Sequence, residues 1–155
     1  IAMSAAEAVQ EGKDFNEVSK IVDNSIKNTK IYISFNKLNN AVKGGRISPS
    51  LKKIAKFFRI NPIITFNEEG IKPIGITFGE DNKADKFKRF VESKIPKNNN
   101  FRIGIAHTQM EAFASKWAKD LQKKYGKEKI IITDVGPALG VHSGPGSLIF
   151  AIQIL

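Results

Sequence analysis

Cysteine is absent from the 155-residue sequence, and arginine, histidine and long apolar runs are scarce. Without cysteine the chain forms no disulfide and uses no thiolate chemistry, which fits a reducing compartment, so we expect a cytoplasmic protein. The longest apolar runs, such as residues 148–152, are far too short to cross a bilayer, so no stable membrane insertion is expected. The chain opens on an Ala-rich, helix-like segment with no signal-peptide pattern, so we expect a piece cut from a longer protein.

Acidic residues are outnumbered, since 25 Lys and Arg face 15 Asp and Glu for a net charge of +10. Only four of the basic residues are arginines, the type favoured for bidentate phosphate and base contacts. The lysines are spread over the polar faces of expected helices. We therefore expect no DNA partner, and a basic nucleic-acid-binding domain is kept as an alternative. An acidic protein or an anionic membrane surface is a further possible partner for this charge.

Helical and strand-like periodicities alternate along the chain without an internal repeat. Asp14 and Glu17 have the spacing of a capping box, and Phe15 is expected on the apolar face of the helix that follows. Residues 101–133 predict a β-α-β unit with two parallel strands. The sequence thus predicts one α/β domain over residues 1–155, a two-layer fold with a mixed sheet. The expected helices are 1–11, 15–26, 36–43, 49–58, 82–94 and 109–125, and the expected strands are 30–35, 60–66, 71–78 (a hairpin with the turn 67–70), 101–106, 128–133 and 148–155.

The segment Gly136–Ser147 is the most unusual part of the sequence, because six of its twelve residues are Gly or Pro. It carries His142, one of only two histidines, and it directly precedes the apolar strand 148–155. Glycine permits backbone conformations that a Cβ forbids, and proline fixes φ. We therefore predict a sharply bent loop that presents one imidazole and several amides from a rigid scaffold.

Several functions fit an imidazole in such a loop. No metal site is expected, because His107 stands alone elsewhere and no second ligand lies at metal-binding spacing. A serine nucleophile, Ser143 or Ser147, is disfavoured because adjacent side chains rarely face each other and Gly-x-Ser-x-Gly is absent. An anion site built from glycine amides, the imidazole and a hydroxyl is more natural. A purely structural turn stays open as well.

A second glycine-rich segment is Gly44-Gly45-Arg46-Ile47-Ser48. Two glycines permit a close approach of the backbone, and the neighbouring guanidinium offers a fork of donors. Helix ends often carry glycine beside a basic residue, so the same pattern fits a simple cap. It is not a phosphate-binding Walker loop, because Gly-x-x-x-x-Gly-Lys-Ser/Thr is missing. The 11 phenylalanines fit either a core or the wall of an apolar channel.

The two glycine-rich segments together resemble the signature segments of the DegV family of bacterial fatty-acid-binding proteins. The second segment reads Gly136-Pro137-x-x-Gly140-x-His142-x-Gly144-Pro145-Gly146, and Asn61-Pro62-Ile63-Ile64 also resembles a strand of that family. The resemblance covers nearly the whole chain. It implies the C-terminal lobe of a DegV-like protein with the EDD fold, whose N-terminal lobe, the part that grips the carboxylate in relatives, is absent from this chain.

The resemblance also implies a function. It places His142, Arg46 and Ser143 at the mouth that binds a fatty-acid carboxylate, with the backbone shaped by Gly44, Gly45, Gly140, Gly144 and Gly146. Relatives present a bound long-chain fatty acid to a kinase that makes acyl phosphate, and no cofactor is implied. We therefore expect a lipid-binding protein that pairs with its own N-terminal lobe, not an enzyme. The alternative from another class is a phosphotransfer enzyme with His142 as nucleophile.

Overall fold

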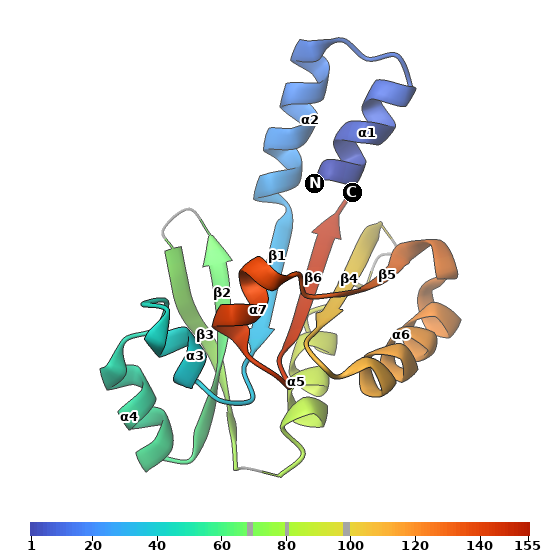
Figure 1. Ribbon diagram of the computed structural model, residues 1–155. Helices are drawn as coiled ribbons and strands as arrows, with labels where there is room; N and C mark the ends of the chain where they lie inside the picture. The colour runs from blue at the N-terminus through green and yellow to red at the C-terminus, as the bar shows by residue number, and fades with distance from the viewer. Residues whose placement is uncertain (68–69, 80, 98–99) are drawn as a thin grey trace.

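The computed structural model describes residues 1–67, 70–79, 81–97 and 100–155. Helices and strands alternate along most of the chain, as the periodicities predict (Figure 1). In chain order the elements are α1 (Ala2–Gln10), α2 (Phe15–Lys27), β1 (Thr29–Ser34), α3 (Asn39–Lys43), α4 (Pro49–Phe57), β2 (Ile60–Asn67), β3 (Gly70–Phe78), α5 (Lys83–Glu92), β4 (Phe101–His107), α6 (Glu111–Tyr125), the 3-10 helix η1 (Lys127–Lys129), β5 (Ile130–Asp134), α7 (Pro137–Ser143) and β6 (Leu148–Ile154).

The strands form one six-stranded mixed sheet in the order β3-β2-β1-β6-β4-β5. The last strand of the chain, β6, lies inside the sheet and is antiparallel to both β1 and β4. Strands β4 and β5 are parallel, and β1, β2 and β3 pair antiparallel in sequence order. The predicted mixed sheet, the parallel pair and the β2–β3 hairpin are therefore confirmed. Residues 68 and 69 of the predicted hairpin turn lie outside the described residues.

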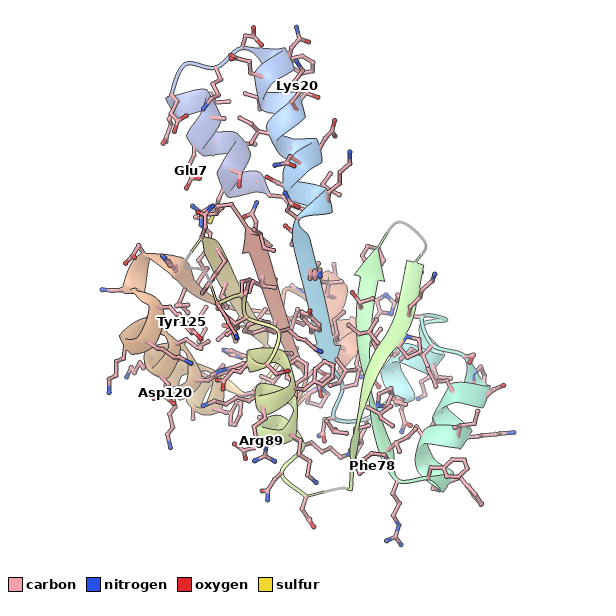
Figure 2. All side chains as sticks on the ribbon, turned by 180° about the vertical axis from the view of Figure 1, so that it is seen from behind. Glu7, Lys20, Phe78, Arg89, Asp120 and Tyr125 are labelled. Carbon is pink, nitrogen blue, oxygen red and sulfur yellow. The ribbon has the colours of Figure 1, made fainter. Side chains whose placement is uncertain are left out.

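The main core lies between one face of the sheet and helices α5 and α6, which cover that face (Figure 2). Every second residue of β4 is buried, so the period of two in the sequence matches the pleat of the strand. The ring of Phe150 in β6 is fully buried and stacks on Trp117 of α6, with centroids 5.4 Å apart. Phe87 and Val91 of α5 are buried in this core as well. This sheet and helix layer confirm the expected α/β fold with a mixed sheet.

Three short helices lie on the opposite face, where α7 crosses in front of the sheet and α3 and α4 flank it (Figure 1). A small second core joins Ala41 of α3, Ile47 and Ile64 of β2. The predicted start of α4 is confirmed, because the Ser48 hydroxyl accepts a hydrogen bond from the Leu51 amide at 3.2 Å and Pro49 occupies the first turn. These helices cover only part of this face, and the rest carries half-buried residues of β1, β6 and β4.

Helices α1 and α2 form a hairpin that projects beyond the end of the sheet (Figure 1). The predicted capping box is present: the Glu17 amide donates to Asp14 Oδ1 at 2.9 Å, and the Asp14 amide donates to Glu17 Oε2 at 3.0 Å. The expectation that Phe15 packs on an apolar face is wrong, because its side chain is 85% exposed. Phe15 is the first residue of α2 and lies at the tip of the hairpin, out of reach of the sheet.

The glycine- and proline-rich segment also differs from its prediction. Residues Pro137–Ser143 form the helix α7 where a bent loop was expected. Pro137 stands at the first helical position, where its missing N–H costs nothing, and Gly144 ends the helix with φ +69°. Helix α3 likewise begins at Asn39, three residues after its predicted start. The composition that suggested a loop thus forms a short helix with glycine-rich ends.

We expect the two phenylalanine substitutions Phe150→Ala and Phe15→Ala to have very different effects on stability. Phe150→Ala leaves a cavity against Trp117 and should lower the free energy of unfolding by about 3–5 kcal/mol. Phe15→Ala removes an exposed ring and should change it by less than about 0.5 kcal/mol. Chemical denaturation followed by Trp117 fluorescence measures both values. Equal losses for the two variants would contradict the placement of the core.

Candidate functional site

The C-terminal ends of β1, β4 and β5 meet at one end of the sheet. Leu148, the first residue of β6, is paired with Ser34 on one side and with His107 on the other, and His107 is paired with Asp134. The segments that follow these three strands, including α3, α7 and the glycine-rich ends of α7, therefore gather at this end. Crevices outside the carboxyl ends of strands are common ligand sites in α/β proteins.

Thr108 fastens residues 144–147 to the end of β4. Its hydroxyl donates to the Gly144 carbonyl at 2.6 Å and accepts a hydrogen bond from the Ser147 amide at 3.0 Å. Its backbone amide donates to the Ser147 carbonyl at 3.0 Å, and its carbonyl accepts from the Gly146 amide at 2.8 Å. Four hydrogen bonds to one residue leave this segment little freedom, so α7 is held in a fixed position over the sheet.

His142 lies in the last turn of α7, and its half-buried imidazole rests on the backbone of Gly44 at the end of α3. A Cβ at Gly44 would overlap Nδ1 of the imidazole and would lie 2.7 Å from Cε1, closer than real Cβ contacts come. The two glycine-rich segments of the sequence, almost 100 residues apart, therefore meet here. We call this junction of α3 and α7, with His142, Gly44, Arg46 and Ser143, the mouth.

Gly45 and Arg46 complete a Schellman motif at the end of α3. The Gly45 amide donates to the Val42 carbonyl at 3.0 Å, the Arg46 amide donates to the Ala41 carbonyl at 2.8 Å, and Gly45 has φ +69°. Arg46, two residues after Gly44, is exposed. Glycine is thus needed at the two positions for different reasons: Gly45 supplies the left-handed turn that ends α3, and Gly44 leaves room for the imidazole of His142.

The other predicted glycines differ in how strictly the structure requires them. A Cβ at Gly144 would lie 2.7 Å from Nδ2 of Asn40, and a Cβ at Gly146 would lie 2.8 Å from Nδ2 of Asn36. Both positions therefore require glycine. Gly140 does not, because the atom nearest to a Cβ at that position, the Val135 carbonyl oxygen, would be 4.0 Å away. The asparagines were not predicted, and their spacing from the glycines in sequence offers no signal for them.

Ser143 and His142 point in different directions, as neighbours on a helix do. The Ser143 side chain is 5% exposed, and its hydroxyl has no hydrogen-bond partner within the described part of the chain. The Ser147 hydroxyl donates to the backbone carbonyl of Ser143 at 2.7 Å, so this hydrogen bond does not involve the Ser143 hydroxyl. Leu139 and Val141 of α7 are exposed. Helix α7 thus turns one unpaired hydroxyl inward and two apolar side chains outward.

A second histidine site lies next to the mouth and was not predicted. His107 is 4% exposed at the end of β4, and its Nδ1 lies 3.3 Å from Oδ1 of the exposed Asp134. The direction of this contact does not make a hydrogen bond, so Nδ1 is unpaired among residues 1–67, 70–79, 81–97 and 100–155. The sequence signal was present, because His107 continues the alternation of buried residues Phe101, Ile103 and Ile105. A cavity of about 440 Å³ adjoins the pair, between α7 and the ends of β4 and β5.

Beside the mouth, this face of the sheet presents two rows of small or apolar residues, which we call the floor; of these, Ile33 also packs against the second core. One row crosses β1, β6, β4 and β5, and the next row runs parallel to it one pleat closer to the mouth. Gly104 and Ala106 keep the centre shallow, while isoleucines flank it, and most of these side chains are half-buried. The rows are Ile31, Ala151, Gly104 and Ile131, then Ile33, Ile149, Ala106 and Thr133.

Neither a metal cluster nor a membrane span accompanies this site in the described residues. No group of three or more His, Asp or Glu side chains among them could hold a metal ion. No helix that the structure describes is long and apolar enough to cross a membrane. The site presents an imidazole, a guanidinium, a buried hydroxyl and an apolar surface.

Comparison with known proteins gives a consistent result. Residues 1–154 match the model of a family described as uncharacterised protein, DegV family. A DegV domain-containing protein of Clostridium perfringens is 32% identical over 146 residues, which are 94% of this chain and 51% of that protein. The structure of a fatty acid binding DegV family protein from Streptococcus agalactiae matches with a TM-score of 0.79 at 26% identity, over 99% of this chain and 54% of that one.

A DegV family protein from Eubacterium eligens, whose crystal structure is loaded with heptadecanoic acid, matches with a TM-score of 0.78 at 21% identity, over 99% of this chain and 55% of that one. The chain thus spans about half the length of the relatives that it matches. The fold agrees over nearly all of that half, and the family expected from the two glycine-rich segments is confirmed. The chain belongs to the DegV family.

Proposed function

We propose that this chain is the acyl-binding lobe of a fatty-acid carrier, with the carboxylate at the mouth and the acyl chain on the floor. The observation that carries the proposal is the meeting of His142 and Gly44 directly beside an uncovered apolar sheet face. A polar anchor at the edge of an apolar surface is what a long-chain fatty acid requires. The fatty-acid-binding relative from Streptococcus agalactiae supports the same ligand class.

The mouth has the donors that a carboxylate needs. An ionised carboxylate withdrawn from water is very costly unless hydrogen bonds replace its hydration. The imidazole of His142 and the guanidinium of Arg46 would supply such donors, and the unpaired hydroxyl of Ser143, on the inner side of α7, would supply another to a ligand oxygen that reached it. A ligand oxygen that reached Ser143 would also relieve a buried polar group, whose lack of a partner costs about 1–3 kcal/mol. Contacts with charged donors fix the end of the ligand and its orientation.

The floor would supply most of the binding free energy. Each methylene withdrawn from water contributes about 0.8 kcal/mol, so a long acyl chain binds tightly once both of its sides are covered. The floor covers one side only. The relatives have about twice the length of this chain, and we infer that their other half, the N-terminal lobe, covers the second side. The exposed Leu139 and Val141 of α7 would then pack against that lobe.

A carrier presents its ligand and does not transform it. We infer that the carboxylate at the mouth is offered to a fatty-acid kinase in the cytoplasm. A phosphotransfer role for His142 is less well supported, because the imidazole packs on Gly44 and no carboxylate within the described part of the chain forms an ion pair that would orient it. The scattered arginines likewise give no support to nucleic-acid binding.

We expect the protein, purified at the length that the cell produces, to carry a long-chain fatty acid detectable by native mass spectrometry. His142→Ala and Arg46→Ala should each raise the dissociation constant for that acid by about tenfold or more, since each removes a hydrogen bond to a charged group. Arg89→Ala, on α5 behind the opposite face (Figure 2), is the control with the same loss of charge. A lipid-free protein, or mouth variants that bind as the control does, would contradict the proposal.

The contact between Gly44 and His142 makes a separate prediction. Gly44→Ala should push the imidazole out of place, lower the free energy of unfolding by about 1–3 kcal/mol and weaken fatty-acid binding as much as His142→Ala does. Gly140→Ala lies in the same junction but has free space around it. It should change the dissociation constant by less than about twofold and the free energy of unfolding by less than about 0.5 kcal/mol. Calorimetric titration and thermal unfolding measure them. Unchanged binding in Gly44→Ala would show that the imidazole does not hold the ligand.

A further inference from the structure

Strands β1 and β2 separate soon after they meet. Only two residue pairs join them, Ile33 with Ile64 and Ser34 with Ile63, whereas β1 stays paired with β6 along its whole length from Thr29. Beyond these pairs the Thr65 hydroxyl donates to the Ile31 carbonyl at 2.7 Å and makes a single side-chain bridge. The diverging strands leave a cavity of about 1260 Å³, which we call the notch. Its volume exceeds the range of common small-molecule pockets, about 300–1,000 Å³.

The walls of the notch are apolar. Ile31 of β1, Phe66 of β2 and Phe90 of α5 line it, together with Tyr32, whose ring meets that of Phe90 edge-on at 6.2 Å. Ile74 of β3 joins them because of a bulge: Ile63 is paired with Gly75 and Ile64 with Pro73, so Ile74 is the extra residue. Bulges commonly redirect a side chain in this way. Phe66 and Ile74 are exposed.

The rim of the notch is cationic. Lys27 at the end of α2, Lys30 of β1 and Lys94 after α5 line the cavity, and Lys94 Nζ lies 5.2 Å from the centroid of the Phe90 ring. Among the described residues that line the notch there is no Asp or Glu. Three ammonium groups around an apolar wall attract an anion and hold its hydrocarbon portion. Burial raises the pKa of the Tyr32 hydroxyl above its ordinary value, so this group stays an uncharged donor near neutral pH.

We propose that the notch is a second lipid site, which binds a long-chain anionic amphiphile with its head group at Lys27, Lys30 and Lys94 and its alkyl chain against Ile31, Phe66 and Ile74. The site is distinct from the mouth, because none of the mouth residues lines it. It also does not depend on the mouth's proposed role. Carboxylate and phosphate head groups share the chemistry that the lysines recognise, so both a fatty acid and a phosphorylated lipid fit it.

Short probes separate the two sites. Ile33 lies between the notch and the mouth, and the four residue steps from Lys30 to Ser34 span about 13 Å of extended strand. An extended alkyl chain advances about 3.6 Å for every three carbon–carbon bonds, so a ten-carbon chain reaches only about 11 Å. A probe with its head group at one site is therefore too short to reach the head-group position of the other. Decanoate, decyl phosphate and uncharged decanol are therefore titrated below their micelle concentrations into the isotope-labelled protein, at the length that the cell produces.

Amide chemical shifts report the site and the dissociation constant of each probe. We expect shifts at Lys30, Ile31 and Thr65, with at least one anion binding about tenfold more tightly than decanol. Lys27→Gln combined with Lys30→Gln should weaken binding of that anion by about 3–10-fold and leave decanol binding unchanged, since each partly exposed ion pair contributes only modestly to affinity. Lys53→Gln combined with Lys56→Gln, on α4, removes the same charge elsewhere and should change nothing. The anion that binds more tightly, decanoate or decyl phosphate, identifies the head group that the lysines prefer.

Three results would overturn the second site: shifts confined to α3 and α7, decanol binding as tightly as both anions, or equal effects of the two lysine pairs. Loss of the notch shifts in His142→Ala would overturn it as well, because it would make the notch a part of the mouth. If the mouth variants bind fatty acid as their control does while the chemical shifts at the notch remain, the result would count against the proposed fatty-acid carrier and leave the second site standing. The two proposals therefore fail separately.

Discussion

The position of β6 between β1 and β4 is the constraint on which the rest of the structure depends. Six residue pairs join β6 to β1 and seven join it to β4, so the last strand of the chain connects the two halves of the sheet. Its buried backbone groups find their hydrogen-bond partners only in this position. Because Ser147 directly precedes β6, the glycine-rich segment must start from the end of the sheet where β1, β4 and β5 also finish. The mouth lies there for that reason.

At the mouth, helices α3 and α7 fit together by close steric packing where a network of polar contacts could have joined them. Helices α3 and α7 come close enough that the imidazole of His142 occupies the space of a side chain at Gly44, and Asn40 does the same at Gly144. Close packing of this kind fixes rotamers without hydrogen bonds. The polar groups of His142 and Ser143 are consequently not consumed by the fold. A site that stays rigid while its donors stay free is suited to a ligand that brings its own acceptors.

Local patterns were enough to predict most of the elements, and contacts distant in sequence account for what was missed. The capping box at Asp14 and the cap at Ser48 depend on residues three positions apart, so both were predictable. Phe15 was misplaced because periodicity does not reveal that α2 extends beyond the sheet. Helix α7 was predicted as a loop because glycine and proline make up half of the segment 136–147, although Pro137 and Gly144 sit where helices favour them. The asparagines at the mouth and the divergence of β1 from β2 depend on tertiary pairing alone.

The mouth and the notch lie toward opposite ends of β1, so the two proposed sites would be coupled through the length of the ligand. By the same estimate of chain length, an acid of 16 or more carbons anchored at the mouth would extend about 18 Å along the floor, past Ile31 and into the notch. Its tail would then compete with an amphiphile whose head group lies at the lysines, whereas a short acid would not. Linkage makes such an effect reciprocal, so a lipid in the notch would favour short acids at the mouth and would help to expel long ones. The lysines around this apolar cavity would then give part of the net charge of +10 a specific role in binding.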